Sequence, residues 1–204
     1  MKRILFVIMC YSAGGGAESL LTTVVNNLNP NKYKIDIIEI TNAGKKTEPV
    51  NKNITVLPYI MKSNDPERKR KMYYVYHEPE KVFNRFVKDE YDLYVSWNYQ
   101  RPTFLLPPDK KNIMWIHGDC YNLADETLTE ERELQNQAFY KANKIVGISD
   151  ITMQSLIDLF PAHKDRFIEI NNGVDIAKIK RMSEETTNIK LCHPSLLYIG
   201  RIED

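Results

Sequence analysis

The sequence has no hydrophobic run long enough to cross a membrane and no excess of one charge. None of its segments approaches about 18 consecutive apolar residues, the length at which a transmembrane helix becomes plausible. Its 28 basic and 27 acidic residues leave a formal net charge of +1. No global field therefore directs the chain to nucleic acid, and any anion site must be local. The 204 residues suffice for one large core but are few for two complete domains.

Cysteine is scarce and shows no recognisable spacing. The three cysteines, Cys10, Cys120 and Cys192, are odd in number and lie far apart. They match neither a zinc motif nor the disulfide framework of a secreted domain. A reducing compartment is therefore expected. We interpret the chain as cytoplasmic, with a peripheral position at the inner face of a membrane as an extension of that hypothesis.

The amino terminus resembles the start of a signal peptide in one respect. Lys2 and Arg3 precede an apolar run at 4–10, but no small-residue cleavage pattern follows the run. A buried first strand explains it better, because strands inside a parallel sheet are apolar on both faces.

Short apolar runs alternate along the chain with segments whose apolar residues recur at helical spacing. Strands are expected at 3–9, 34–40, 53–57, 92–96, 112–116, 144–148, 167–170 and 196–199. Helices are expected at 17–28, 79–88, about 127–143 and 149–160. This alternation predicts an α/β fold, a Rossmann-like parallel sheet with helices on both faces. Residues 1–176 would form this domain, 177–194 a linker, and 195–204 the first strand of a second domain.

Two of the expected helices begin at capping signals. Thr127 followed by Glu130 predicts a capping box. Ser149 predicts an N-cap for the helix that ends at Phe160 and Pro161.

Three consecutive glycines, Gly14, Gly15 and Gly16, separate the first strand from the first helix. Without Cβ atoms they let a ligand approach the backbone, and the helix N-terminus offers unpaired N–H groups that suit a phosphate. A dinucleotide fingerprint needs a further glycine where the chain has Ser19, and a Walker loop needs a Gly-Lys-Ser/Thr sequence that is absent. The loop therefore indicates a ligand-facing turn, and a tight turn without a ligand is the alternative.

His117 follows an expected strand. A histidine at the carboxyl edge of a sheet can donate to an anion or transfer a proton, and a satisfied structural histidine is the alternative. Cys120 could act as a nucleophile beside His117, but no third orienting group is evident. The other histidines are interpreted as surface residues: His77, His163 and His193.

Further polar residues follow the expected strands and would line a cleft at the same sheet edge. They are Asn98, Asp119, Ser149 and Asn172. Asn172 also belongs to a sequence at 171–175 whose residue types make a sharp turn. Arg201 follows the last expected strand beside Gly200, where a guanidinium fork suits a diphosphate, although a surface arginine is the alternative.

The sequence offers little to bind a metal. It has no Asp-x-Asp pair, and its histidines and cysteines lack ligand spacing. We expect no metal and no other cofactor. If the chain belongs to an enzyme that releases a diphosphate, positive side chains and helix termini would then neutralise this leaving group.

A basic run at 68–71 is followed by an aromatic run at 72–76, in the least regular part of the sequence. Basic residues beside aromatic ones suit an anionic membrane surface or a nucleic acid. A solvated loop is the simpler interpretation, and the near-zero net charge argues against nucleic acid. Peripheral membrane contact through 62–76 is kept as a hypothesis.

Five motifs occur in a fixed order along the chain. They are Gly15-Gly16-Ala17-Glu18, His117, Val146-Gly147-Ile148-Ser149, Asn172-Gly173-Val174-Asp175 and Tyr198-Ile199-Gly200-Arg201. Together they resemble the amino-terminal half of a family 4 glycosyltransferase, a retaining enzyme of the GT-B fold, over essentially the whole chain. The resemblance implies sugar transfer from a nucleotide-sugar donor to a glycan or lipid-linked acceptor in cell-surface polysaccharide synthesis. It places the glycine loop near the donor phosphates or the acceptor, His117 near the transferred sugar, and Arg201 on the diphosphate.

The sequence departs from the family where it stops. The family's motif continues past Arg201 into a Lys-Gly pair and a carboxyl-terminal domain with the nucleotide pocket, whereas this sequence ends at Asp204. We therefore expect a fragment of a longer enzyme, inactive by itself. A nucleotide-sugar epimerase of the same architecture and a Rossmann-like binding module without catalysis are the alternatives. A reading frame that continues into that domain would favour the enzyme.

Overall fold

The structure is a computed structural model that describes residues 1–45, 50–186 and 194–196. The chain divides into two units, Met1–Gly173 and Val174–Asp204. The first unit contains the sheet and its helices, and the second contains one helix within the described residues.

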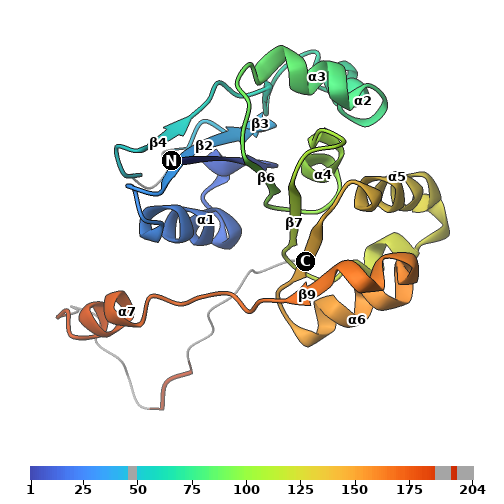
Figure 1. Cartoon of the computed structure of the whole chain (residues 1–204). Coiled ribbons are helices and arrows are strands. Elements are labelled where there is room, and N and C mark those ends of the chain that lie inside the picture. Colours follow the sequence, from blue (N-terminus) through green and yellow to red (C-terminus); the bar gives the residue numbers. More distant parts are fainter. Residues whose placement is uncertain (46–49, 187–193, 197–204) are drawn as a thin grey trace. The chain divides into compact units, whose positions relative to one another are not determined.

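A seven-stranded parallel sheet forms the centre of the first unit, in the order β4-β2-β1-β6-β7-β8-β9 (Figure 1). The strands are β1 Lys2–Ile8, β2 Tyr33–Glu39, β4 Ile54–Val56, β6 Leu93–Ser96, β7 Asn112–Ile116, β8 Lys144–Gly147 and β9 Phe167–Glu169. Two short strands, β3 Thr41–Asn42 and β5 Met61–Lys62, pair beside it. Residues 4–8 of β1 and 35–39 of β2 are buried on both faces, as their apolar runs require. The expected Rossmann-like α/β fold is confirmed.

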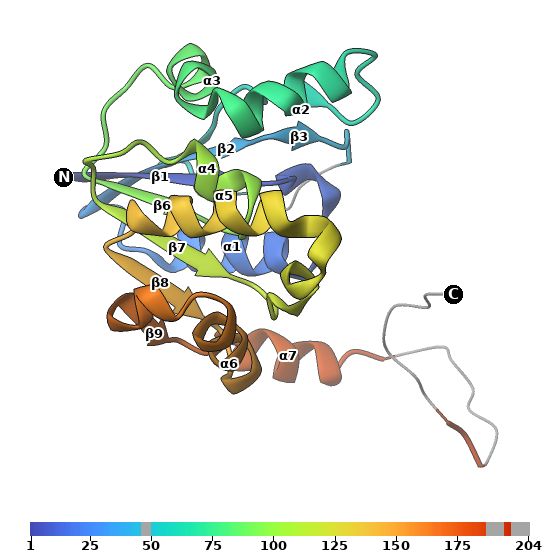
Figure 2. The same cartoon turned by 90° about the vertical axis from the view of Figure 1, so that its right-hand side faces the viewer.

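Helices cover the sheet on both faces, and the two faces have separate cores (Figures 1 and 2). Helix α1, Gly16–Asn27, packs Leu21 and Val25 against one face. The other face contacts α2 Arg68–His77, α3 Pro79–Phe86, α4 Arg101–Leu105, α5 Thr129–Tyr140 and α6 Asp150–Leu159. Helix α1 and helices α4 to α6 lie on opposite faces because the crossovers are right-handed. The crossover from β1 leads to β2, toward one lateral edge of the sheet, whereas those after β6 lead toward the other edge.

Four short 3-10 helices complete the first unit: η1 Tyr11–Ala13, η2 Tyr121–Ala124, η3 Glu126–Leu128 and η4 Pro161–Arg166. Ser149 caps α6 as predicted, since its Oγ accepts a hydrogen bond from Thr152 N. The predicted capping box is wrong. Asp125 accepts from the backbone N–H and hydroxyl of Thr127 instead, and α5 begins at Thr129 without a side-chain cap.

Within the described residues of the first unit, two helices occupy segments in which the sequence predicted none. Helix α2 lies in the basic and aromatic stretch interpreted as a solvated loop, and α4 lies between β6 and β7. Arginine, lysine and methionine favour helix, but α2 buries only Val75 fully, so its apolar periodicity is weak.

His163 is not a surface residue, contrary to the prediction. Its side chain is fully buried between α5 and η4, where Nε2 hydrogen-bonds Asn136 Oδ1 at 2.9 Å. The ring packs edge-on against Phe139 and Tyr140. His77 is exposed as expected, and His193 lies outside the described residues.

The segment expected as a linker, 177–194, begins within helix α7, Ile176–Ser183. Asp175 caps this helix by accepting from Lys178 N at 2.9 Å. The strand expected at 196–199 falls almost wholly outside the described residues, as does Arg201. Across the described ranges, none of the helices is both long and apolar enough to cross a membrane.

Candidate functional site

Strands β1 and β6 are neighbours in the sheet, although the start of β6 lies some 85 residues beyond the end of β1. After β1 the chain turns to β2 through α1, and after β6 it turns the other way to β7 through α4. Ligands of open α/β sheets bind at the carboxyl ends of strands where the order reverses in this manner. At that place Met9 N donates to Asn98 Oδ1 at 3.3 Å and joins the ends of the two strands.

The glycine loop lies at this reversal, between η1 and α1. Gly14 has a φ of +71°, which a side chain would strain, so its role is conformational. Gly15 is the N-cap of α1 and makes no side-chain cap. A Cβ at Gly16 would meet nothing within 4 Å, so the chain itself leaves open space there. The loop therefore presents free helix N–H groups and an uncovered backbone, as a ligand-facing turn would.

Glu18 lies close to the glycine loop. Its Oε2 is 2.5 Å from the position that a Cβ on Gly15 would take. A carboxylate in the first turn interacts favourably with the positive end of a helix. An anionic ligand group would have to displace this carboxylate, whereas a hydroxyl could hydrogen-bond to it.

Glu39 holds the start of the glycine loop through hydrogen bonds to Ser12, and it was not identified from the sequence. It is 3% exposed at the end of β2, and its Oε2 accepts from both Ser12 N and Ser12 Oγ at 2.8 Å. Its other oxygen accepts from Asn42 Nδ2. Ser12 Oγ also accepts from Ala43 N at 2.7 Å. An acidic residue at the end of a mainly apolar strand was the signal that could have revealed it.

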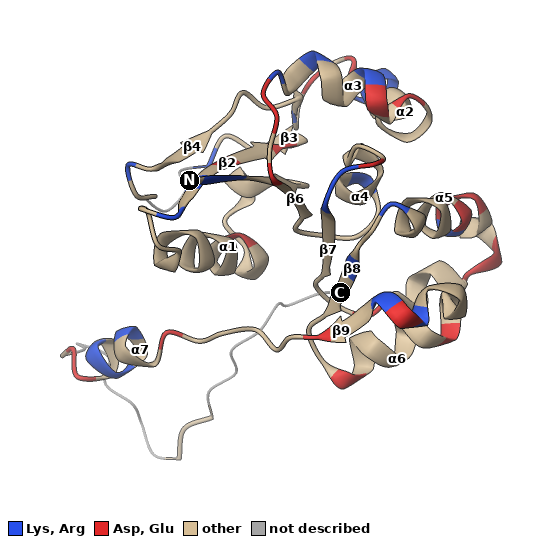
Figure 3. Ribbon diagram, in the orientation of Figure 1, with Lys and Arg blue, Asp and Glu red and all other residues tan. Residues whose placement is uncertain are grey.

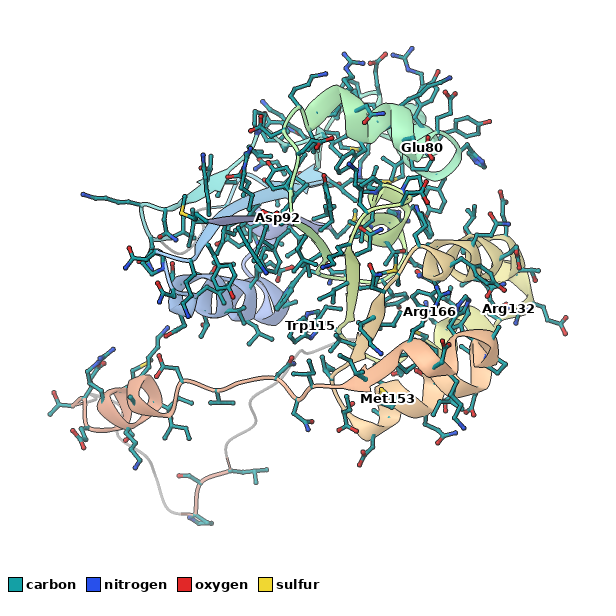
Figure 4. All side chains as sticks on the ribbon, viewed as in Figure 1. Glu80, Asp92, Trp115, Arg132, Met153 and Arg166 are labelled. Atoms are coloured by element: carbon teal, nitrogen blue, oxygen red, sulfur yellow. The ribbon has the colours of Figure 1, made fainter. Side chains whose placement is uncertain are left out.

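Two tryptophan rings connect this loop to His117. Trp97, fully buried after β6, donates from Nε1 to Ala17 O in the first turn of α1 at 2.8 Å. Its ring centroid lies 4.8 Å from those of Trp115 and His117. Figure 4 shows Trp115 directed from β7 toward the side of the sheet on which α1 lies. The glycine loop, Trp97 and His117 thus belong to one site built from β1, β6 and β7.

His117 is held as a neutral imidazole. Burial lowers its pKa from 6.5 to about 4. Its Nε2 and Trp115 Nε1 are buried and have no hydrogen-bond partner among the described residues. Gly118 then turns the chain at a φ of +116°. Unpaired polar atoms beside aromatic rings would be satisfied by the hydroxyls of a bound ligand.

The other predicted site residues have local structural roles or lie farther along the edge. Asp119 is exposed and accepts from Tyr121 N at 3.0 Å, which fixes a turn. Ser149 and Asn172 follow β8 and β9, one and two strands beyond β7. Cys120 is fully buried, and burial raises its thiol pKa to about 12, so it does not supply a thiolate nucleophile.

Gln100 is a further feature of this edge that the sequence did not reveal. Its φ of 59° with ψ of −124° is rare for a residue with a side chain. The buried Gln135 of α5 holds it by accepting from Gln100 N, and Thr103 Oγ1 donates to Gln100 O at 2.6 Å. Backbone held in this way two residues after Asn98 stiffens the loop beyond β6.

No three His, Cys, Asp or Glu side chains gather closely enough to hold a metal ion anywhere in residues 1–45, 50–186 and 194–196. The polar groups available at the sheet edge are helix N–H groups, amides, Glu18 and an imidazole. They suit hydrogen bonding to hydroxyl or phosphate oxygens.

Acid is expected to destabilise the fold partly through the half-buried His117 and the buried His163. Burial lowers the pKa of both His117 and His163 below the unfolded value of 6.5. The unfolded chain then binds more protons, so this stability is complete above about pH 6.5 and is lost as pH falls toward about 4. His117→Gln should reduce the loss of unfolding free energy between about pH 7 and pH 5 by up to about 2 kcal/mol. Urea denaturation at the two pH values measures it. The exposed His77→Gln is the control, and equal acid sensitivity in both variants would contradict the prediction.

No protein-family model matches the sequence, and no curated protein matches it. Solved structures match it in fold. Sucrose-phosphate synthase from Thermosynechococcus elongatus has a TM-score of 0.60 at 10% identity, over 91% of this chain and 53% of that chain. WaaG, a glycosyltransferase involved in lipopolysaccharide biosynthesis, has a TM-score of 0.60 at 12% identity, over 91% and 48%. Anabaena HepE in complex with UDP has a TM-score of 0.52 at 14% identity, over 90% and 50%.

The chain therefore spans about half the length of the solved structures that it matches. At these identities the likeness shows the fold alone. The first unit has the Rossmann-like α/β fold that forms one half of a GT-B glycosyltransferase.

Proposed function

We propose that this chain is the acceptor-side part of a retaining glycosyltransferase of the family 4 type. The enzyme would transfer a sugar from a nucleotide sugar to a glycan or glycolipid acceptor in cell-surface polysaccharide synthesis, at the cytoplasmic side of the membrane. The observation that carries the proposal is His117, a neutral histidine at the carboxyl edge of β7 with a buried, unpaired Nε2 beside two tryptophans. Similar folds in a glycosyltransferase and in HepE bound to UDP-glucose support it.

His117 would touch the transferred sugar. Its Nε2 would hydrogen-bond a sugar hydroxyl, and the indole N–H of the neighbouring Trp115, whose ring centroid lies 6.4 Å away, would offer a donor. A neutral imidazole adds no positive charge near the anomeric carbon, where positive charge develops as the bond to the diphosphate breaks. These interactions position the sugar and strengthen as its charge distribution changes.

The glycine loop would hold the acceptor. Glu18 already occupies the positive end of α1, which favours a hydroxyl-bearing group over a phosphate at Gly15. The acceptor hydroxyl would attack the anomeric carbon while the nucleoside diphosphate leaves from the same face, and the hydroxyl proton would pass to the departing phosphate oxygen. Arg201 is proposed for the diphosphate because of its residue type and place in the sequence, without a metal.

The nucleotide would be bound by a further domain about as large as this chain, since the matched structures are about twice as long as this chain. An epimerase of the same architecture would need further acid–base groups near His117. In the described part of the chain His117 is the one histidine placed at this edge, which favours the transferase.

Residues 1–204 alone are expected to release no nucleoside diphosphate from UDP-glucose, UDP-N-acetylglucosamine or GDP-mannose. A longer protein that also carries the nucleotide-binding domain should release the nucleoside diphosphate in the presence of acceptor. In that protein His117→Ala should lower kcat about 10²- to 10³-fold, because an interaction with the reacting sugar is lost.

The exposed His77→Ala is the matched control and should leave kcat unchanged. A coupled assay of the released nucleoside diphosphate gives the rate for residues 1–204, for the longer protein and for its His117→Ala and His77→Ala variants. Efficient transfer by residues 1–204 alone, or full activity in His117→Ala, would overturn the proposal.

A further inference from the structure

The α2–α3 pair concentrates the positive charge of the molecule. Residues 62–88 contain eight lysines and arginines against four aspartates and glutamates, a net charge of +4, whereas the whole chain carries +1. Figure 3 shows basic residues gathered on these two helices. This excess attracts anions locally even though the chain is nearly neutral.

Two of the four cations at the start of α2 are not neutralised by neighbours. Arg70 pairs with Glu67 at 2.6 Å, and Lys71 pairs with Asp65 at 2.6 Å. Arg68 and Lys69 are exposed and form no ion pair with any described residue. Their charges are therefore free to meet an external anionic surface.

Two exposed tyrosines lie directly after these cations. Tyr73 is 57% exposed and Tyr74 is 42% exposed, and their rings contact each other edge-on at 5.9 Å. Large rings with a polar tip gain most where one end meets apolar matter and the other meets water. Tyrosine is accordingly enriched at membrane–water interfaces.

A cavity of about 440 Å³ opens between α2 and α3. Its apolar wall is formed by Ile60, Val82 and Phe86. Its charged lining contains four cations and one acid: Arg70, Lys71, Lys81, Arg85 and Glu78. An apolar wall with a cationic rim complements a phospholipid, which joins a phosphate to hydrocarbon within one molecule.

We propose that the α2–α3 surface, made of Arg68, Lys69, Tyr73, Tyr74 and Arg85 around this cavity, docks the protein on a membrane containing anionic phospholipids. A single-stranded nucleic acid is a poorer fit, because it needs a continuous groove along which bases stack, and this cavity is confined between two helices. Figure 2 shows α2 above β3, at the end of the first unit toward which its strands point. A docked membrane would therefore lie on the side of the site at β1, β6 and β7. The proposal goes beyond sugar transfer and does not depend on it.

Vesicle flotation with residues 1–204 tests the docking surface. The protein should float with vesicles of phosphatidylcholine and phosphatidylglycerol and should stay behind with phosphatidylcholine alone. Arg68→Gln with Lys69→Gln should lower the partition coefficient about tenfold or more, since each exposed cation contributes independently near an anionic surface. Lys110→Gln with Lys111→Gln removes the same charge from exposed positions before β7, at the opposite edge, and should change the partition less than twofold.

Two further variants separate the parts of the surface. Tyr73→Ser with Tyr74→Ser should weaken flotation at unchanged charge, and Arg85→Gln should weaken it about fivefold by altering the cavity rim. Circular dichroism confirms that each variant is folded. Equal flotation of the Arg68/Lys69 and Lys110/Lys111 variants would overturn the proposal. So would binding that single-stranded RNA competes away while phosphatidylglycerol vesicles do not bind.

Discussion

Replacement of Glu39 by alanine is expected to lower the free energy of unfolding by about 3 kcal/mol or more and to loosen the glycine loop. The carboxylate is buried at the end of β2 and accepts from Ser12 N, Ser12 Oγ and Asn42 Nδ2. Alanine would leave these donors without their partner in a buried place. The carboxylate also fixes η1, from which the glycines follow, so the loop should lose its fixed conformation.

Urea denaturation measures the stability, and amide hydrogen exchange at 12–18 measures the loop. Asp36→Ala is the matched control, because Asp36 lies on the same strand, is equally buried, and bonds Tyr91 and Arg3 away from the loop. Both variants should lose stability, but only Glu39→Ala should speed exchange at 12–18 under conditions in which the rest of the sheet stays protected. Identical exchange patterns would show that Glu39 supports the fold without a special effect on the loop.

Replacement of Trp97 by alanine should cost about 3–5 kcal/mol, as large cavities in a core do. It should also raise the pKa of His117, which is low because partial burial of the ring disfavours its charged form. Trp97 is the largest fully buried side chain among the described residues, and its ring centroid lies 4.8 Å from that of His117. Its removal would let water approach the imidazole and stabilise the charged form.

Proton NMR titration of His117 is the decisive measurement for Trp97→Ala. Phe139→Ala is the control, since Phe139 is equally buried but lies in the core of the other face. Both substitutions should destabilise the protein, and only Trp97→Ala should move the His117 pKa toward 6.5. Trp97→Phe keeps most of the volume but loses the hydrogen bond to Ala17 O, so it should cost about 1 kcal/mol. An unchanged His117 pKa in Trp97→Ala would mean that other groups keep water away from the ring.

The sequence predicted those parts of the fold and site whose signals are local. The apolar runs of β1 and β7, the helical spacing of α1 and the cap at Ser149 are each readable within about ten residues. The glycine loop and His117 were also identified as residues that follow strands. Their proximity was not readable, because it depends on β6 inserting between β1 and β7.

The features that the sequence did not reveal depend on tertiary contacts. Glu39 was counted with an apolar strand, although its carboxylate bonds Ser12, which follows the neighbouring strand β1. His163 was assigned to the surface because its packing partners lie in α5. Helix α2 was missed because charge and exposed tyrosine obscured its periodicity. Arg201 stays a prediction, since it lies outside the described residues.

The carboxylate of Glu18 competes with any anionic ligand group for the space beside Gly15. Any ligand group that approaches Gly15 closely meets Oε2 and must exchange with it or bond to it. For a group that must exchange, the measured affinity is the intrinsic affinity multiplied by the fraction of molecules in which the side chain has rotated away. A hydroxyl that bonds to the carboxylate escapes this reduction, so one flexible side chain ranks incoming ligands by charge before any of them reaches His117.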